Sequence, residues 1–306
     1  YEGYAAYASA KDMPRLYSGC YGLGSRDMQP EALIGTVENM LPRGDNSTPQ
    51  KKFFYLSVDF VRETPANPKD EIHGQSVLEA YPHIRNLAVR GSENPNLLPK
   101  ESITVRMHSV GGWGAITTGK NLAMTLYELL GWDIKANPKY GSEKKGQPTT
   151  YYLSASPDPI RVNCEYVYVD VVLSPDPNVH EHSNPVAGLK KGGVLILQSN
   201  REEADLWASF PLWMQKQIVD NDIRVFYLDA FQIAREEAGS ADLQLRMQGI
   251  AFQGAFFAAS SVMKNADLSE EKLFKAIEDQ LQAKFGDKGK RVVDDNLRVV
   301  RRGYSE

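Results

Sequence analysis

The sequence predicts an α/β fold: a doubly wound, mostly parallel sheet preceded by a small βαβ segment and an extended arm. After residue 100, short β-branched and aromatic runs alternate with amphipathic helical segments. A polar stretch rich in proline and asparagine, 91–99, separates this pattern from a shorter strand-helix-strand pattern. We therefore expect a small α/β segment at 1–63, an extended linker or arm at 64–100, and the main α/β domain with C-terminal helices at 101–306.

The first segment contains two candidate strands and one helix. The strands are expected at 16–22 and 53–60, and the helix between them at 29–41, where Pro30 suits the first turn. The arm holds many prolines and asparagines and no clear periodicity. A long irregular segment of this kind favours wrapping around a partner.

The main domain follows a strand-and-helix order. Strands are expected at 102–108, 149–155, 166–173, 193–198 and 223–228, and helices at 117–130, 204–219, 243–262, 268–285 and about 290–301. The run at 193–198 is wholly apolar, which is typical of a central parallel strand. Asp267 and Glu270 predict a capping box for the helix at 268–285, which Gly286 would end.

Composition and charge exclude several classes of protein. A net charge of -4 gives no basic footprint for nucleic acid, and no apolar run approaches the ~20 residues that cross a bilayer. Cys20 and Cys164 are the two cysteines, without CxxC spacing, so the chain cannot hold a four-cysteine cluster or a disulfide framework. We expect a cytoplasmic protein; Tyr1, in place of an initiator Met, suggests a trimmed or incomplete N-terminus.

The strongest chemical signal is the turn after the first strand of the main domain. This glycine turn comprises Ser109, Val110, Gly111, Gly112, Trp113 and Gly114. In such sheets, ligands bind outside the carboxyl ends of the strands, and helix N–H groups freed by glycine favour phosphate. The alternative is a tight turn whose glycines only permit close helix–sheet packing. Trp113 would fill a pocket, stack on a ligand or dock a partner.

Other polar residues give weaker signals. Lys144 and Lys145 precede the second strand of the main domain and could meet phosphates, or form a solvated loop. His180 and His182 lie in a polar loop without a third metal ligand, which favours solvation over metal binding. No catalytic residue and no metal site are predicted in this chain.

The order of these features resembles the γ-type domain of pyruvate and other 2-oxoacid:ferredoxin oxidoreductases. The residues that carry the resemblance are the glycine turn, Gly119-Lys-Asn121, the Lys-Lys loop, Gln253-Gly-Ala-Phe-Phe257, 272–277, Lys284-Phe-Gly-Asp-Lys-Gly289 and Val292-Val-Asp-Asp-Asn296. Upstream, Tyr21-Gly-Leu-Gly-Ser-Arg-Asp27, the helix that Pro30 begins and 53–60 resemble the segment that precedes this domain in fused enzymes.

The resemblance implies a heteromeric complex. Other subunits would carry thiamine diphosphate, Mg²⁺ and iron–sulfur (4Fe-4S) clusters, and ferredoxin would accept the electrons. In members that use coenzyme A (CoA), the resemblance places a CoA-like site at the glycine turn, a lysine and two asparagines. Here the matching residues are Ser109 to Trp113, Lys145 (or Lys144) and Asn296.

Two departures bear on the substrate. Trp113 stands where the family has an aspartate, and Gly249 replaces one asparagine. The resemblance therefore implies a lost or remodelled CoA site, and oxalate oxidoreductase, which forms two CO2 without CoA, is the member we expect. The alternatives are a subunit for pyruvate or another 2-oxoacid that helps to bind CoA, and a scaffold without a small ligand. An autonomous nucleotide enzyme such as an NAD-dependent dehydrogenase is disfavoured, because no acidic residue follows the turn at the required distance.

Overall fold

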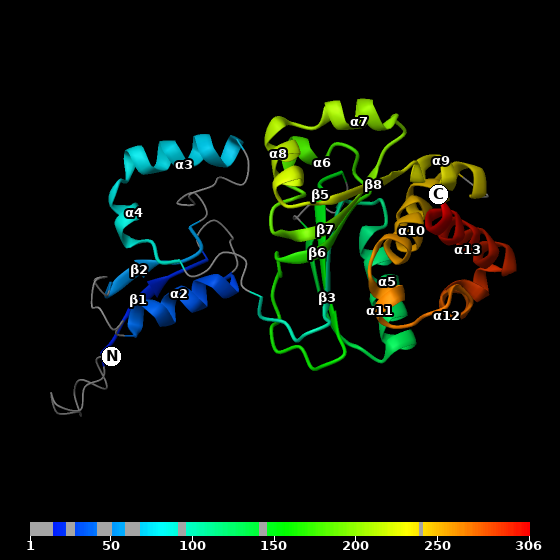
Figure 1. The fold of residues 1–306 in the computed structure, drawn as a ribbon, viewed down its shortest axis with the longest axis horizontal. Coiled ribbons are helices and arrows are strands. Elements are labelled where there is room, and N and C mark those ends of the chain that lie inside the picture. The colour runs from blue at the N-terminus through cyan, green and yellow to red at the C-terminus, as the bar shows by residue number, and fades with distance from the viewer. Residues whose placement is uncertain are drawn as a thin grey trace. The chain divides into compact units, whose positions relative to one another are not determined.

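The computed structural model describes residues 15–22, 28–41, 51–58, 68–90, 96–140, 146–238 and 241–306. The chain divides into two compact units, Tyr1–Pro95 and Asn96–Glu306 (Figure 1). Among the described helices, none combines the length and the hydropathy that a bilayer crossing requires.

The first unit contains the predicted strand-helix-strand element. Strands β1 (Ser18–Cys20) and β2 (Phe53–Tyr55) pair in parallel, and helix α2 (Pro30–Met40) connects them. The small core comprises Ala32, Phe54, Leu56 and Val89. The prediction is confirmed with shorter strands, although residues 59–60 of the second one lie outside the described part.

The expected extended arm at 64–100 is wrong for much of its length. It carries helices α3 (Pro68–Ala80) and α4 (His83–Leu87), after which Ala88 forms a bridge with Tyr55 of β2. Helix α3 has no apolar stripe, and Ile72 within it is 69% exposed. The sequence of α3 therefore has no apolar periodicity that would predict a helix. The remaining indication of a helix was the proline at its start, Pro68.

The second unit is built on a six-stranded sheet in the order β4-β5-β3-β6-β7-β8. The strands are β3 (Ile103–Val110), β4 (Asp133–Tyr140), β5 (Pro148–Ser156), β6 (Val169–Ser174), β7 (Leu189–Gln198) and β8 (Arg224–Leu228). Strands β3, β6, β7 and β8 run parallel, which confirms the fold class.

The other two strands differ from the prediction. Strand β5 pairs with β3 antiparallel, and the unpredicted strand β4 pairs antiparallel with β5 at the edge of the sheet. The sequence of β4, DIKANPKY, lacks a β-branched run and contains Pro138, which edge strands tolerate. The main domain is therefore a parallel sheet extended by an antiparallel pair.

Helices cover both faces of this sheet. The described helices are α5 (Ala115–Leu130), α6 (Val179–His182), α7 (Glu203–Ser209), α8 (Leu212–Asp220), α9 (Ala230–Glu237), α10 (Ala241–Ala259), α11 (Val262–Asn265), α12 (Glu270–Phe285) and α13 (Lys290–Ser305). Val171 and Leu173 pack in the core with α5 and the C-terminal helices, whereas Val172 packs in the core with α7 and α8. This alternation places the strands between two helical layers.

Two helix predictions need correction. The expected helix at 204–219 is broken into α7 and α8, because Pro211 has no N–H to donate. The predicted capping box is also wrong: Ser269 caps α12 by accepting from the Lys272 N–H at 3.3 Å. Asp267 has a left-handed φ of 48°, which is unsuited to an N-cap.

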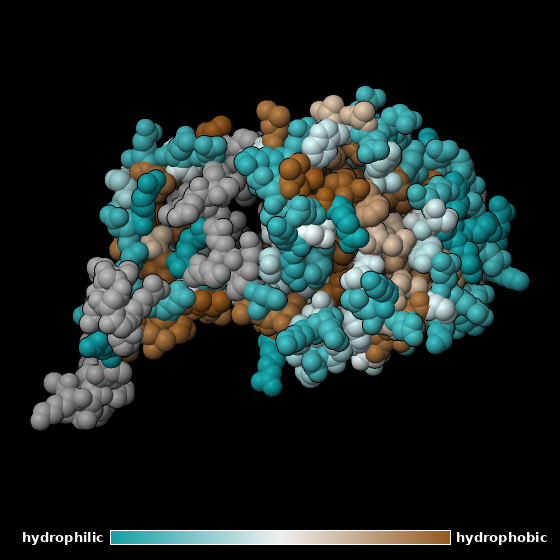
Figure 2. Space-filling view, in the orientation of Figure 1, coloured by the Kyte–Doolittle hydropathy of each residue, from teal (hydrophilic) through white to brown (hydrophobic). Residues whose placement is uncertain are grey.

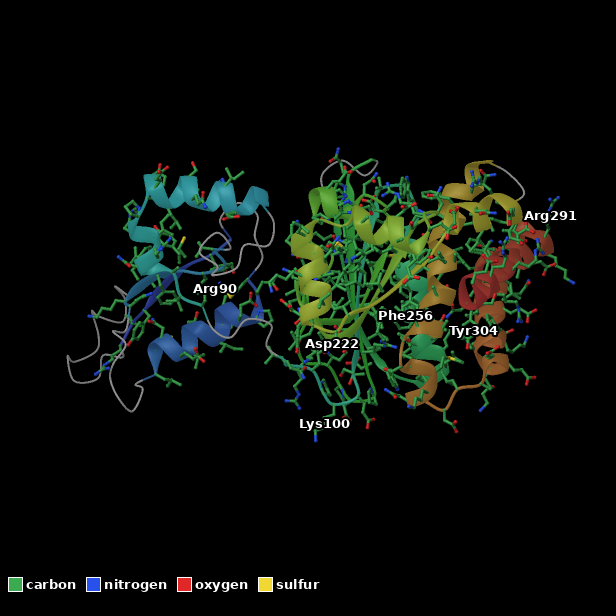
Figure 3. All side chains as sticks on the ribbon, turned by 45° about the horizontal axis from the view of Figure 1, so that its top comes forward. Arg90, Lys100, Asp222, Phe256, Arg291 and Tyr304 are labelled. Atoms are coloured by element: carbon green, nitrogen blue, oxygen red, sulfur yellow. The ribbon has the colours of Figure 1, made fainter. Side chains whose placement is uncertain are left out.

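Helices α10 and α13 cross in close contact. A Cβ added to Gly254 would collide with the Val300 carbonyl oxygen, and one added to Gly303 with that of Ala251. Figure 3 shows Phe256 of α10 and Tyr304 of α13 within this group of helices. The crossing fixes the position of Asn296 on α13, which lines the site described next.

Candidate functional site

The glycine turn joins β3 to α5 in a conformation that requires glycine at two positions. Gly112 and Gly114 have φ angles of 98° and 87°, in the left-handed region. Gly111 donates its N–H to the Gln147 carbonyl at 2.8 Å and accepts from the Gly146 N–H at 3.0 Å. These bonds fix the turn against the start of β5.

The turn leaves the N-terminus of α5 open. Its N-cap, Gly114, has no side chain, so no side-chain acceptor caps the first N–H groups of the helix. Such a helix end carries a partial positive charge and favours an anion.

A groove of about 610 Å³ lies against this helix end. We call it the glycine-turn groove. Its lining comprises Val110, Gly111, Gly112, Gly114, Ala115, Ile116, Thr117, Tyr140, Thr149, Met247, Ile250, Lys284, Phe285, Lys288, Val292 and Asn296. The turn and α5 therefore face the three C-terminal helices across the groove.

Two lysines supply positive charge in the groove. The amino groups of Lys284 and Lys288 lie 5.4 and 5.5 Å from the centre of the Phe285 ring, in cation–π contact. Lys284 Nζ also donates to Asn121 Oδ1 at 2.7 Å. Among the described residues, neither lysine pairs with a carboxylate, so both charges are available to an anionic ligand.

Lys284 is partly buried, which disfavours its charged form. Burial, and secondarily the nearby charge of Lys120, lower the pKa of Lys284. An anion bound in the groove would reverse this effect, because it would stabilise the charged amino group.

The structure brings together most of the predicted site residues. Val110, Gly111, Gly112, Gly114 and Asn296 line the groove, and Asn296 Nδ2 donates to the Val292 carbonyl at 2.7 Å. Ser109 does not line it; its side chain is buried, and its Oγ has no described hydrogen-bond partner. Lys145 and Lys144 lie outside the described residues.

Trp113 is directed away from the groove. Its ring is half-buried and packs edge-on against Phe231, with ring centroids 5.4 Å apart and an interplanar angle of 83°. Trp113 does not line the groove, so its ring does not fill the space that a CoA-like ligand would occupy there.

Gly249 has a packing reason. A Cβ at this position would lie 2.7 Å from Thr118 Oγ1, so glycine lets α10 approach α5. Gly119 on α5 similarly permits contact with the ring of Tyr151. Glycine in place of the family asparagine at 249 thus permits close packing of the two helices and leaves no polar side chain at this position.

Sequence reasoning gave no role to several lining residues. Lys284, Phe285 and Lys288 were noted only as part of a C-terminal motif, and Tyr140 not at all. Two lysines at i and i+4 flanking an aromatic residue at a helix end were the available signal. Their distance from the glycine turn in sequence concealed that they line the same groove.

The histidine pair lies on the short helix α6, whereas a loop was expected. His182 Nε2 and Asp176 Oδ2 are 2.7 Å apart, and His180 packs near Phe210. The described part of the chain holds no group of three or more potential metal ligands.

The chain is similar to known proteins over most of its length. The family described as "Pyruvate ferredoxin/flavodoxin oxidoreductase" matches residues 104–306. The pyruvate:ferredoxin oxidoreductase of Moorella thermoacetica is 23% identical over 94% of this chain, which spans 21% of that relative. The common γ subunit of the pyruvate/ketoisovalerate oxidoreductases of Pyrococcus furiosus is 28% identical over 67% of this chain and 96% of its own length.

The fold is also found in solved structures. One of them is the 2-oxoglutarate:ferredoxin oxidoreductase of Magnetococcus marinus, with 2-oxoglutarate, CoA and succinyl-CoA bound. The TM-score is 0.51 at 20% identity, covering 68% of this chain and 31% of the other.

Proposed function

The chain belongs to the pyruvate ferredoxin/flavodoxin oxidoreductase family, and from that premise we propose that it is the CoA-binding part of a ferredoxin-reducing 2-oxoacid oxidoreductase. The observation that carries this proposal is the glycine-turn groove, where an uncapped helix end faces Lys284 and Lys288. The relative from Magnetococcus marinus is described with CoA bound, which agrees with the proposal.

The residues of the groove fit the chemistry of CoA. Its phosphates would meet the two lysines and the N–H groups of α5, which favour anions through charge and dipole. Its pantetheine arm would lie along Met247, Ile250 and Val292, an apolar wall that excludes water. Binding of this kind would orient the thiol and keep it available at the groove mouth.

The remaining chemistry would belong to other parts of the assembly. Thiamine diphosphate with Mg²⁺ supplies the carbanion chemistry that cleaves a 2-oxoacid, and iron–sulfur clusters carry electrons to ferredoxin. The two cysteines of this chain, Cys20 and Cys164, are too few to ligate such a cluster. In this proposal the chain binds and positions one substrate, and its partners perform the redox steps.

The first unit supports a place in an assembly. Leu33, Val37 and Leu41 follow a helical repeat on and just after α2, and each is more than half exposed. Figure 2 shows this hydrophobic surface along the lower edge of the unit. A contiguous apolar stripe of this kind is typical of a surface that a partner covers.

The test is CoA binding to the chain in its natural assembly, measured by calorimetric titration. We expect Lys284→Gln and Lys288→Gln each to weaken binding about tenfold, because each removes a charge-assisted contact. Lys272→Gln, on the exposed face of the same helix α12, is the matched control and should change nothing. Equal affinity in all four proteins would overturn the proposal.

A second candidate is oxalate oxidation without CoA. The observation that favours it is the lack of polar side chains at two family positions, since Gly249 packs against Thr118 and Trp113 against Phe231. Oxalate yields two CO2 and two electrons, so no acyl group requires a thiol.

Turnover distinguishes the two candidates. Ferredoxin reduction by the intact assembly would be measured with pyruvate or with oxalate, with and without added CoA. The first candidate predicts a strict CoA requirement with a 2-oxoacid such as pyruvate. Reduction with oxalate in the absence of CoA would establish the second.

A further inference from the structure

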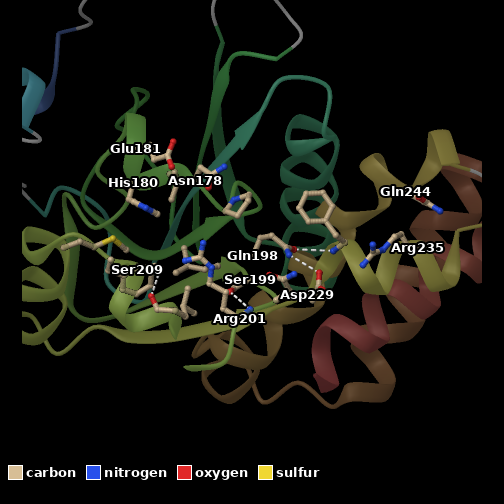
Figure 4. Close-up of a pocket in the computed structure, with 18 residues that line it drawn as sticks. Asn178, His180, Glu181, Gln198, Ser199, Arg201, Ser209, Asp229, Arg235 and Gln244 are labelled. Carbon is tan, nitrogen blue, oxygen red and sulfur yellow. Dashed lines mark hydrogen bonds between the residues drawn. The ribbon is translucent and has the colours of Figure 1, made fainter. Parts of the chain in front are cut away.

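A second cavity lies at the carboxyl ends of three parallel strands. It has a volume of about 730 Å³ and is bounded by the segments that follow β6, β7 and β8. We call it the strand-end pocket. Figure 4 shows Asn178, His180 and Glu181 on one side, Arg235 and Gln244 on the other, and Gln198, Ser199 and Asp229 between them. Doubly wound sheets bind ligands at this edge, and the pocket shares no lining residue with the glycine-turn groove.

Two arginines line the pocket. Arg201 follows β7 and Arg235 lies on α9. Within the described residues, neither guanidinium forms an ion pair. Both therefore retain their donors for a ligand, and guanidinium suits phosphate oxygens.

Among the described residues, neither acidic residue of the wall forms an ion pair with these arginines. Asp229 Oδ1 accepts from Gln198 Nε2 and from the Gln232 N–H, both at 3.0 Å, so it serves as the N-cap of α9. Glu181 is exposed on α6, on the side opposite Arg235. The pocket therefore carries both signs of charge, and the two arginines are its cations without an ion-pair partner among the described residues.

The inner wall is apolar and aromatic. Phe210 is almost fully buried and packs beside Leu206 and Met214 in the core cluster beneath the pocket. Phe231 also lines the pocket, and the ring of Trp113 packs against it. The amides of Asn178 and Gln198 add donors and acceptors near these rings.

We propose that the strand-end pocket binds a nucleoside phosphate. The phosphate contacts Arg201 and Arg235, and the base lies against the aromatic wall with its polar edge toward the amides. The volume falls within the range of small-molecule sites, ~300–1,000 Å³. The Trp113–Phe231 pair then separates two ligands at one edge of the sheet, which gives the tryptophan of the glycine turn a structural role.

The test is a titration of the chain in its natural assembly with ADP, adenosine and inorganic phosphate. We expect ADP to bind, and adenosine and phosphate each to bind at least about tenfold more weakly, because each lacks half of the contacts. Arg201→Gln and Arg235→Gln should each weaken ADP binding about tenfold. Arg224→Gln, exposed at the amino end of β8, is the matched control and should leave the affinity unchanged.

The alternative outcomes are distinct. Undetectable ADP binding, or binding that both arginine variants leave intact, would overturn the proposal. Binding lost only in Lys284→Gln would place ADP in the glycine-turn groove, which overturns the pocket while supporting the CoA proposal. If inorganic phosphate bound as tightly as ADP, the pocket would be an anion site that does not recognise a base, and the proposal would be overturned.

Discussion

The two cavities at the carboxyl edge of the sheet are built by different means. The glycine-turn groove combines the turn after β3 with side chains from helices α10, α12 and α13, more than 130 residues further along. The strand-end pocket is made largely by side chains on short segments directly after β6, β7 and β8. One site therefore depends on helix packing, and the other on the loops of the sheet.

This difference determines how each site responds to a shift of the C-terminal helices. Displacement of the C-terminal helices would move Lys288 and Asn296 away from the glycine turn, whereas the strand-end loops would follow the sheet. Buried Arg106 on β3 holds the segment that enters β7 by donating to the carbonyls of Pro185 and Ala187 at 2.9 and 2.6 Å. The following predictions test this separation.

The largest effect is expected from Gly303→Ala. The added Cβ would collide with the Ala251 carbonyl, which belongs to rigid helix backbone, so we expect the free energy of unfolding to fall by about 3 kcal/mol. Chemical denaturation would measure the fall. Ala258→Ser, on the exposed face of α10, is the control and should cost little. Unchanged stability in Gly303→Ala would show that the helices can separate without cost.

A smaller effect on stability is expected from the ionisation of His108, which is buried on β3. Its Nε2 accepts from Arg106 Nε at 3.0 Å, and burial, with Arg106 and His182, holds its pKa well below the ordinary value. Above pH about 6.5 the ring is neutral in both states. Below that pH only the unfolded chain takes up the proton, so stability should fall by about 1.4 kcal/mol per pH unit.

Denaturation at pH 7.5 and 5.5 measures this dependence. In His108→Gln the amide oxygen can still accept from Arg106, and the part of the pH dependence due to His108 should disappear. The same loss of stability at low pH in both proteins would assign the effect to other groups.

The sequence was informative where periodicity and burial agree. The strands at 193–198 and 223–228 and the helix at 268–285 were predicted within a few residues, because each has a strong apolar pattern. Strand β4 and helix α3 were missed for the opposite reason, since an edge strand and an exposed helix bury few side chains. Their local sequences carry little of the signal on which prediction depends.

The site was predictable only in part. The glycine turn could be predicted from the local sequence, because glycines directly after a strand indicate a tight turn with positive φ angles. The contact of Lys284 with Asn121 follows no local rule, since the two residues lie 163 positions apart on different helices. The direction of the Trp113 ring depends on Phe231, whose helix α9 was not predicted.

The smallest effect on the groove is expected from Trp113→Ala. The ring contacts Phe231 and does not line the groove, so CoA affinity should change less than about threefold. In the same variant, ADP affinity should fall by more than CoA affinity changes, because Phe231 loses the ring that packs against it. Trp207 packs on Phe210, another lining residue of the pocket, with centroids 6.0 Å apart, so Trp207→Ala should weaken ADP binding and leave CoA binding unchanged. A tenfold loss of CoA affinity in Trp113→Ala alone would show that the two cavities are not separate, because the ring between them would then control the groove as well.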